Sequence, residues 1–277
     1  MILVTGATGN VGSELVRALA DAGEPVRGLI RDDSRRARLP DGTEAAVGDL
    51  NDPDSLGAAL EGVRGVHLLA GYAGLPSALE RMRAAGVERV TLQSSSAAPD
   101  GDTTNAVARY HIESEATIRA SGLAWTFLQP NSFMSNTLEW AEPLRTGDVV
   151  TAPFAGVRVA TIDPRDIAAV AATALTTGGL DGRSLRLSGP ESLLAAERLA
   201  ILGSVLDRDL RLEPQSDEDA RAEMSAAMPA EYVDAFFRFF VDGDLDESQV
   251  LPTVAEVLGR PPRTFRAWAE EHADAFG

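Results

Sequence analysis

Short apolar runs alternate with amphipathic stretches from residue 1 to about residue 150. The apolar runs read ILVTG, PVRGLI, TEAAVG, GVHLLA, ERVTLQSS and LAWTFLQ. After the first run, Val11, Leu15 and Leu19 recur at the spacing of one helix face, and Leu56 and Leu60 repeat it further on. The alternation predicts an α/β fold, a doubly wound and mostly parallel sheet of six strands joined by helices.

After about residue 150 the pattern loosens into short extended segments and helices. The extended segments read DVVTA, VRVATI and SLRLS. Helices are expected to begin near Pro164, Glu191 and Ser216, and the chain beyond Ser216 has a mostly helical pattern. We therefore expect a first domain over residues 1–150 and a smaller, mainly helical substrate or lid lobe over residues 151–277, packed on the first domain and partly interleaved with it.

Three glycines, Gly6, Gly9 and Gly12, follow the first apolar run. In a Rossmann-type unit the first glycine allows a tight turn, the second lets the backbone approach a pyrophosphate, and the third lets helix and strand pack closely. The helix expected from about Asn10 would direct its positive amino end at the same crevice. A simple strand-to-helix turn explains a glycine triplet alone, but this context predicts a bound dinucleotide. Its expected contacts are Gly6, Thr8, Gly9, Asn10, Val11 and Gly12.

The end of the second apolar run bears on the choice of dinucleotide. Enzymes that use NAD place an acidic residue there for the ribose diol, whereas this chain has Arg31, with Arg35 one helical turn later. Two guanidinium groups would clamp a 2′-phosphate, so the sequence favours NADP(H) over NAD(H). Asp32 and Asp33 weaken this inference, and a solvated arginine cluster is the alternative.

Residues after the third and fourth apolar runs complete the expected cofactor site. Asp49 and Leu50 would contact the edge and the face of the adenine, and Ala70 would contact the cofactor from the end of the fourth run. A turn or cap role ahead of DPDSL explains Asp49 equally well.

Composition excludes several other kinds of chemistry. The formal net charge of −17 repels nucleic acid and anionic lipid. The chain has no cysteine and only 3 histidines, so no metal site is expected, and the absence of lysine excludes a Schiff base. No apolar run approaches the roughly 18 residues of a membrane span, and no signal segment precedes the first strand pattern. We expect a soluble cytoplasmic protein that binds neither nucleic acid nor a membrane.

The order and spacing of eight segments are specific when taken together. They read VTGATGNVGSELV, RGLIRDDS, GDLNDPDSL, LQSSS, YHIESEATIRASGLAWTFLQPNSFMSN, IDPRDIAAVAATAL, LSGPESL and GRPPRTFRAWAEEHADAF. In them the chain resembles the NmrA-like branch of atypical short-chain dehydrogenases, which includes NAD(P)H-dependent quinone oxidoreductases. The resemblance implies a Rossmann domain that binds NAD(P), with Pro130 and Asn131 beside the nicotinamide, and a C-terminal substrate lobe. It also implies that Phe133, Met134 and Asn136 face the substrate, although core packing explains Phe133 and Met134 equally well.

The catalytic pair of typical short-chain dehydrogenases is missing. In those enzymes a lysine four residues after a tyrosine lowers the pKa of the tyrosine, but here Tyr110 is followed at that spacing by Ser114. The quinone-reductase-like members often have a lysine where this chain has Tyr110 itself. The departure argues against ordinary ketone reduction and favours hydride transfer to an acceptor that needs no strong acid.

Ser95, Tyr110 and His111 remain as catalytic candidates. Ser95 would bind a carbonyl or the nicotinamide ribose and Ser96 the substrate, with capping of loop backbone as the alternative. Tyr110 has no cation one helical turn away, so it suits a wall or a hydrogen-bond donor better than an acid. His111 has a suitable ordinary pKa for a proton shuttle, and a structural role is its alternative.

Four phenylalanines near the C-terminus cover more than one face of a predicted helix, and they would pack in the lobe, line a substrate wall or meet another subunit. They are Phe236, Phe237, Phe239 and Phe240. As a whole, the sequence predicts an NADP(H)-dependent oxidoreductase that transfers hydride to a small aromatic or quinone-like acceptor. An NAD(P)-binding redox-sensing regulator and a non-redox cyclase or lyase are the alternatives. A homodimer or a complex with a protein partner stays open.

Overall fold

The computed structural model describes residues 1–99 and 101–277, which form two compact units. The first unit consists of Met1–Gly101, Arg109–Pro130 and Pro164–Arg186, and the second of Asp102–Ala108, Asn131–Asp163 and Leu187–Gly277. The chain therefore passes between the units several times; the sequence led us to expect a second lobe from about residue 151 that is partly interleaved with the first.

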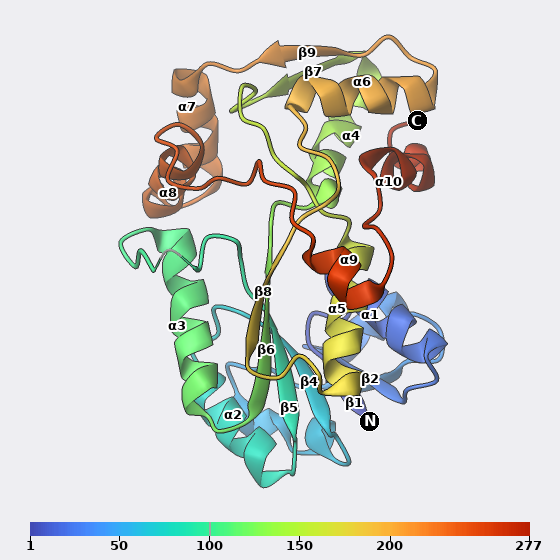
Figure 1. Ribbon diagram of the computed structural model, residues 1–277, viewed down its shortest axis with the longest axis vertical. Coiled ribbons are helices and arrows are strands. Elements are labelled where there is room, and N and C mark those ends of the chain that lie inside the picture. Colours follow the sequence, from blue (N-terminus) through green and yellow to red (C-terminus); the bar gives the residue numbers. More distant parts are fainter. Residues whose placement is uncertain (100) are drawn as a thin grey trace. The chain divides into compact units, whose positions relative to one another are not determined.

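The first unit is built on a sheet that has seven strands within the described residues, in the order β3-β2-β1-β4-β5-β6-β8 (Figure 1). The strands are β1 (Ile2–Val4), β2 (Val26–Ile30), β3 (Glu44–Val47), β4 (Gly65–Leu69), β5 (Arg89–Gln93), β6 (Ala124–Pro130) and β8 (Arg183–Leu187). All neighbouring pairs from β3 to β6 are parallel. The strand order reverses between β1 and β4, the point at which doubly wound sheets bind their ligands.

Helices cover both faces of this sheet (Figure 1). One face carries α1 (Asn10–Asp21) and α5 (Pro164–Thr177), and the other carries α2 (Leu75–Ala84) and α3 (Ala106–Ala120). The short 3₁₀ helices η1 (Asp33–Arg38), η2 (Pro53–Leu56) and η3 (Ala58–Leu60) join β2 to β3 and β3 to β4. Leu15 and Leu19 of α1 are completely buried, as the helical spacing in the sequence requires.

The predicted fold class is confirmed. Each of the six apolar runs forms a strand, and α1 and α5 begin at the expected Asn10 and Pro164. The segment SLRLS, which the sequence assigned to the second lobe, supplies most of β8 and so extends the sheet beside β6.

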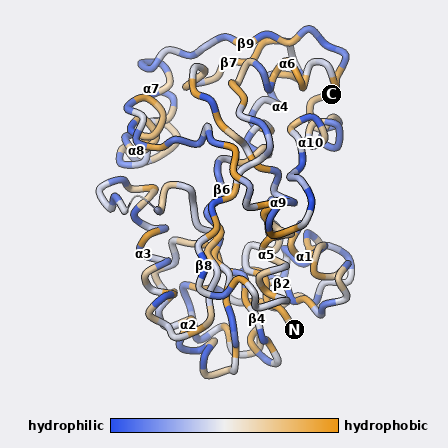
Figure 2. The backbone as a smooth tube through the Cα atoms, in the orientation of Figure 1, coloured by the Kyte–Doolittle hydropathy of each residue, from blue (hydrophilic) through white to orange (hydrophobic). Residues whose placement is uncertain are grey.

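The second unit is mainly helical, with a small parallel sheet of β7 (Val149–Ala152) and β9 (Arg211–Pro214). Its helices are η4 (Met134–Trp140), α4 (Ala141–Thr146), α6 (Ala195–Leu206), α7 (Asp217–Ala227), α8 (Ala230–Phe240), α9 (Thr253–Leu258), α10 (Phe265–Glu271) and η5 (Ala273–Ala275). Its core joins Leu144, Val150, Leu199 and Trp268. Figure 2 shows that the connection from β9 to α7 is hydrophilic.

Local chemistry explains where the helices of the second unit begin. Ser216 caps α7, because its hydroxyl group accepts a hydrogen bond from the Asp219 amide at 3.1 Å. Helix α6 begins at Ala195, later than the expected Glu191, because the chain before it is extended and Leu193 pairs with Val159.

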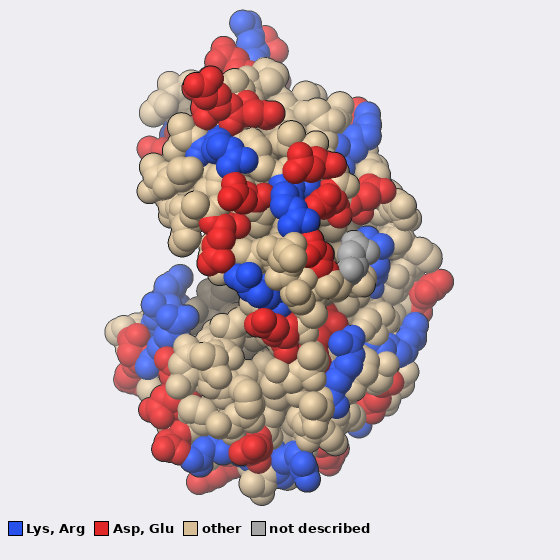
Figure 3. Space-filling view, turned by 90° about the vertical axis from the view of Figure 1, so that its left-hand side faces the viewer, with Lys and Arg blue, Asp and Glu red and all other residues tan. Residues whose placement is uncertain are grey.

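The surface carries both signs of charge. On the face shown in Figure 3, acidic and basic side chains are interspersed. Many arginines lie in ion pairs, as Arg238 does with Asp102 at 2.5 Å and Asp244 at 2.7 Å. Among the described residues, every helix is too short or too polar to cross a membrane.

Candidate functional site

The first unit contains a pocket at the carboxyl ends of its central strands. The cavity measures about 120 Å³. It is lined by Thr5, Gly6, Thr8, Leu29, Ile30, Arg31, Arg35, Gly48, Asp49, Leu50, Leu69 and Tyr72. These residues belong to the ends of β1, β2, β3 and β4 and to the turns that follow them, so the pocket lies where the strand order reverses. The sequence analysis named five of its polar or glycine residues and Leu50, but not Tyr72.

The glycine turn between β1 and α1 has the geometry that the sequence predicted. Gly6 has φ +62°, which a side chain would strain, and its carbonyl oxygen accepts a hydrogen bond from the Gly9 amide at 2.9 Å. A Cβ atom on Gly12 would lie 2.1 Å from the same oxygen. Because α1 begins after Gly9, no side chain caps its first turn, and an anion at this helix end would meet backbone N–H groups. Asn10 and Val11 occupy the first turn of the helix, with Val11 buried.

Arg31 and Arg35 both line the pocket, but they differ in their partners. Arg31 is exposed and makes no hydrogen bond or ion pair with any residue that the structure describes. Arg35 lies 3.5 Å from the Asp32 carboxylate, which also accepts a hydrogen bond from the Ser34 amide at the start of η1. The Ser34 hydrogen bonds lower the pKa of Asp32, which therefore stays charged. Asp32 is occupied as a helix cap and as a partner of Arg35.

Asp49 and Leu50 contribute to the pocket from the end of β3. Leu50 is buried, and the Asp49 side chain accepts a hydrogen bond from the Asn51 amide at 2.9 Å. Asp49 thus has the turn role that the sequence left open, while it also lines the pocket. Ala70, at the end of β4, lies beside the pocket residue Leu69 and packs against the core of the first unit.

The serine run after β5 is held by a buried network. The Ser94 hydroxyl group donates to Glu115 at 2.6 Å, and Glu115 also accepts from Gln129 and pairs with Arg119 at 2.9 Å. Ser95 is half-buried and its hydroxyl oxygen accepts a hydrogen bond from the Ala97 amide at 3.1 Å, so it caps the loop as the alternative reading of the sequence held. Ser96 is buried.

Tyr110 and His111 lie side by side on α3, with ring centroids 4.2 Å apart. Gly71, shortly after β4, has φ +89°, and a Cβ atom added there would lie 3.3 Å from the Tyr110 ring. Burial lowers the pKa of His111 to about 4, so its imidazole is neutral at pH 7. Its Nδ1 atom is buried without a hydrogen-bond partner among the described residues. The proton-shuttle hypothesis depended on an ordinary histidine pKa near 6.5, and the lowered pKa of His111 does not meet that condition.

Pro130 ends β6, and its carbonyl oxygen accepts a hydrogen bond from the Ser96 amide at 3.0 Å. Asn131 begins the next segment of the second unit and is buried. Its side-chain amide donates to the carbonyl oxygens of Glu247 at 3.0 Å and Ala160 at 3.3 Å. The Asn131 side chain therefore holds segments of the second unit together, and its place beside the nicotinamide stays a prediction.

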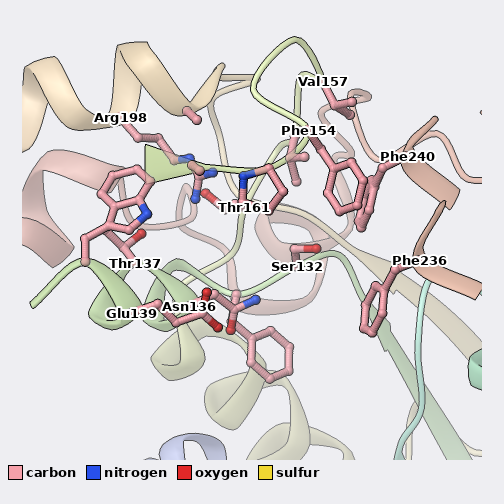
Figure 4. A pocket seen from close by; sticks show the side chains of 16 residues that line it. Ser132, Asn136, Thr137, Glu139, Phe154, Val157, Thr161, Arg198, Phe236 and Phe240 are labelled. Atoms are coloured by element: carbon pink, nitrogen blue, oxygen red, sulfur yellow. The ribbon is translucent and has the colours of Figure 1, made fainter. Parts of the chain in front are cut away.

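A second pocket, of about 210 Å³, lies within the second unit (Figure 4). Its lining includes Phe133 and Asn136, for which the family resemblance implied a contact with substrate, and that role stays a prediction. Met134 is instead buried in the core of this unit, which is the alternative that the sequence left open. Phe133 is the N-cap residue of the 3₁₀ helix η4, and Met134 is its first residue.

The aromatic cluster of α8 divides between this pocket and the protein interior. Phe236 and Phe240 line the pocket, whereas Phe237 and Phe239 are buried. The sequence analysis missed the polar residues of the lining and Phe154, which come from segments far apart in the chain. They are Ser132, Thr137, Glu139, Thr161 and Arg198. Arg198 stands in the segment AAERLAILG, beside Glu197, and the sequence alone does not separate it from a solvated arginine on a helix.

Comparison with known proteins gives this geometry a context. Residues 6–178 match the model of a family described as NAD(P)H-binding. Over its whole length the chain is 42% identical to the (4-alkanoyl-5-oxo-2,5-dihydrofuran-3-yl)methyl phosphate reductase of Streptomyces griseus subsp. griseus, of which it covers 99%. It is 37% identical to the NAD(P)H azoreductase of Xenophilus azovorans, again over the whole chain and 99% of that protein.

Two solved structures share the fold. An NADPH-dependent quinone oxidoreductase from Escherichia coli has a TM-score of 0.79 at 22% identity, covering 98% of this chain and 99% of its own. The Citrobacter sp. triphenylmethane reductase complexed with NADP(H) has a TM-score of 0.80 at 20% identity, covering 99% of this chain and all of its own. The glycine turn, the strand order and the match over residues 6–178 agree with the NAD(P) binding that the sequence resemblance implied, and the chain belongs to the NAD(P)H-binding family.

Proposed function

We propose that the protein is an NADPH-dependent reductase of a small, conjugated, quinone-like acceptor. The observation that supports this most is the pocket at the ends of β1 to β4. Its lining includes both the glycine turn and Arg31, which has no ion-pair partner among the described residues. NADPH supplies a hydride, and the reduced acceptor takes up one proton from water. The chain binds and orients both ligands.

The cofactor half of the proposal follows from charge. The amino end of α1 and the backbone at Gly6 and Gly9 would hold the pyrophosphate. The 2′-phosphate of NADPH is held by Arg31, which has no carboxylate to release first, and then by Arg35. An NAD enzyme would need a free carboxylate at the end of β2, but Asp32 caps η1 and pairs with Arg35.

The choice of acceptor follows from the absence of a strong proton donor among the candidate catalytic residues Tyr110 and His111. The chain has no lysine to activate Tyr110, and the imidazole of His111 is neutral at pH 7. A quinone-like acceptor suits such a site, because its reduced oxyanion is a weak base that water can protonate. Curated relatives include an azoreductase and a reductase of a dihydrofuranone phosphate, both of which have conjugated acceptors by name.

We place the acceptor in the pocket of the second unit. Its lining combines aromatic side chains with a few polar groups, which is the usual make-up of a small-molecule site. Phe133 and Asn136, already expected to face a substrate, are part of it.

The test is an anaerobic assay that follows NADPH absorbance with 1,4-naphthoquinone, the azo dye methyl red and cyclohexanone as acceptors. We expect turnover with the quinone and little or none with cyclohexanone, whose alkoxide product needs a strong acid. Failure of every acceptor to oxidise NADPH would refute the reductase. Conversion of an acceptor without loss of NADPH would favour the non-redox alternative instead.

A further inference from the structure

The pocket of the second unit has an unsatisfied polar end. Arg198 projects into it from α6, and its guanidinium group makes no hydrogen bond or ion pair with any described residue. Its Nε atom is buried without a hydrogen-bond partner in the part of the chain that the structure describes. The residues Thr137 and Thr161 are 1% and 2% exposed. Their hydroxyl oxygens are also buried without hydrogen-bond partners among the described residues. Three unpaired polar groups thus meet in one cavity wall, a costly arrangement unless a ligand satisfies them.

Arg198 keeps its charge in this setting. Its guanidinium carbon lies 5.3 Å from the centre of the Trp140 ring, which stabilises a cation. Burial lowers the pKa of Arg198 and the charge of Glu139 raises it, but an arginine remains protonated at pH 7 after such shifts. Partial burial of the Glu139 carboxyl group raises its pKa, and the charge of Arg198 lowers it. The pair interacts through space without a salt bridge.

The opposite end of the pocket is aromatic (Figure 4). The rings of Phe154 and Phe240 lie 5.2 Å apart, and those of Phe236 and Phe240 lie 6.4 Å apart. Phe154 has φ +52°, a conformation that is rare for a bulky residue and is found mostly where a function requires it. The cavity is therefore cationic at one end and apolar at the other.

From this arrangement we propose that the pocket binds an acceptor with an anionic oxygen group, a phosphate or a carboxylate, which Arg198 holds while Phe236 and Phe240 contact the apolar part. That the ligand is a hydride acceptor rests on the proposed function. That the pocket recognises an anion rests on the pocket residues alone. The planar guanidinium group matches both anions in two-point geometry. Thr137 and Thr161 line the same pocket as Arg198. Glu139 compensates part of the Arg198 charge in the empty pocket and would repel a bound anion.

The test measures binding without cofactor, by calorimetry on the full chain, with 1-naphthyl phosphate, 1-naphthoate and the neutral 1-naphthol. We expect both anions to bind at least about tenfold more tightly than 1-naphthol, since a hydrogen-bonded charge pair is worth this much. Comparison of the two anions identifies the preferred group. Equal binding of all three probes would overturn the proposal.

Variants separate the roles of the two charges. Arg198→Gln should weaken the preferred anion roughly 10- to 100-fold and 1-naphthol by less than about threefold. Arg266→Gln is the matched control, because Arg266 is exposed on α10 and lies outside the pocket lining. Glu139→Gln, at an exposed position, should tighten anion binding a few-fold even if Arg198→Gln fails to fold. Loss of anion and naphthol binding in equal measure in a folded Arg198→Gln, or no change in Glu139→Gln, would contradict the proposal.

Turnover separates this inference from the proposed function. With NADPH, 1,4-naphthoquinone-2-sulfonate should have a lower KM than 1,4-naphthoquinone, and Arg198→Gln should raise the KM of the sulfonate more than that of the neutral quinone and so remove the difference. If neither quinone is reduced but 1-naphthyl phosphate still binds through Arg198, the reductase assignment fails and the anion site stands. If quinones are reduced with no anion preference, the anion site fails and the reductase stands.

Discussion

Replacing Arg31 by alanine tests how the protein selects its cofactor. Arg31 lines the pocket of the first unit and has no protein partner among the described residues, so its removal breaks no ion pair in the unliganded protein. Any loss of affinity therefore reports on the ligand. We expect Arg31→Ala to weaken NADPH and to leave NADH nearly unchanged, because only NADPH carries a 2′-phosphate.

The size of the effect follows from the exposure of the side chain. A hydrogen bond to a charged group contributes about 1.5–3 kcal/mol, and each 1.4 kcal/mol is about tenfold in affinity. Solvent screens an exposed arginine, which favours the lower end, so we expect a loss of about tenfold for NADPH. Arg35→Ala should cost less, because Arg35 must share its charge with Asp32 at 3.5 Å.

The assay is a calorimetric titration of each variant with NADPH and with NADH, carried out at low and at high salt. Arg36→Ala is the matched control, since Arg36 is exposed on η1, pairs with Asp33 at 2.8 Å and lies outside the pocket lining. The NADPH loss in Arg31→Ala should shrink as salt increases. Equal losses for both cofactors, or a loss in Arg36→Ala as large as in Arg31→Ala, would refute the phosphate clamp.

Further predictions concern the glycine turn and the buried histidines. Gly12→Ala should lose NADPH binding and about 1–3 kcal/mol of stability, because its Cβ atom would lie 2.1 Å from the Gly6 oxygen; a Tm equal to that of Gly57→Ala, whose Cβ meets nothing within 4 Å, would contradict this. His111→Gln should keep most of its kcat with naphthoquinone at pH 7, because burial lowers the pKa of His111 to about 4 and leaves it neutral; a loss above about 100-fold at unchanged KM would restore it as the proton donor. Burial also lowers the pKa of His67 to about 4, so between pH 6.5 and 4 the unfolded chain binds protons that the folded chain does not. Calorimetric Tm values should fall as the pH decreases through this range, with a shallower slope in His111→Gln than in the wild type.

Much of the first unit could be predicted from the sequence, because its signals are local. The spacing of the apolar runs predicts the strands. The requirement for glycine at positions 6 and 12 arises within the single turn between β1 and α1, so it too can be predicted from nearby sequence. Arg31 is also a local signal, since the end of β2 always faces the crevice in this topology.

The second unit shows why the rest could not be predicted. Thr137, Thr161 and Arg198 meet in one pocket although they belong to η4, an extended segment and α6. Nothing near Arg198 in the sequence distinguishes it from a solvated arginine on a helix. Met134 and Phe133 are adjacent, and their different surroundings depend on tertiary packing that no sequence period encodes. The same holds for the repeated passage of the chain between the two units.

Calorimetric titration of the purified chain with NADPH tests the central claim most directly. The account predicts saturable binding of one NADPH per chain, with NADH bound more weakly. A chain that is folded by circular dichroism but shows no saturable binding of NADPH, NADP⁺, NADH or NAD⁺ would contradict it.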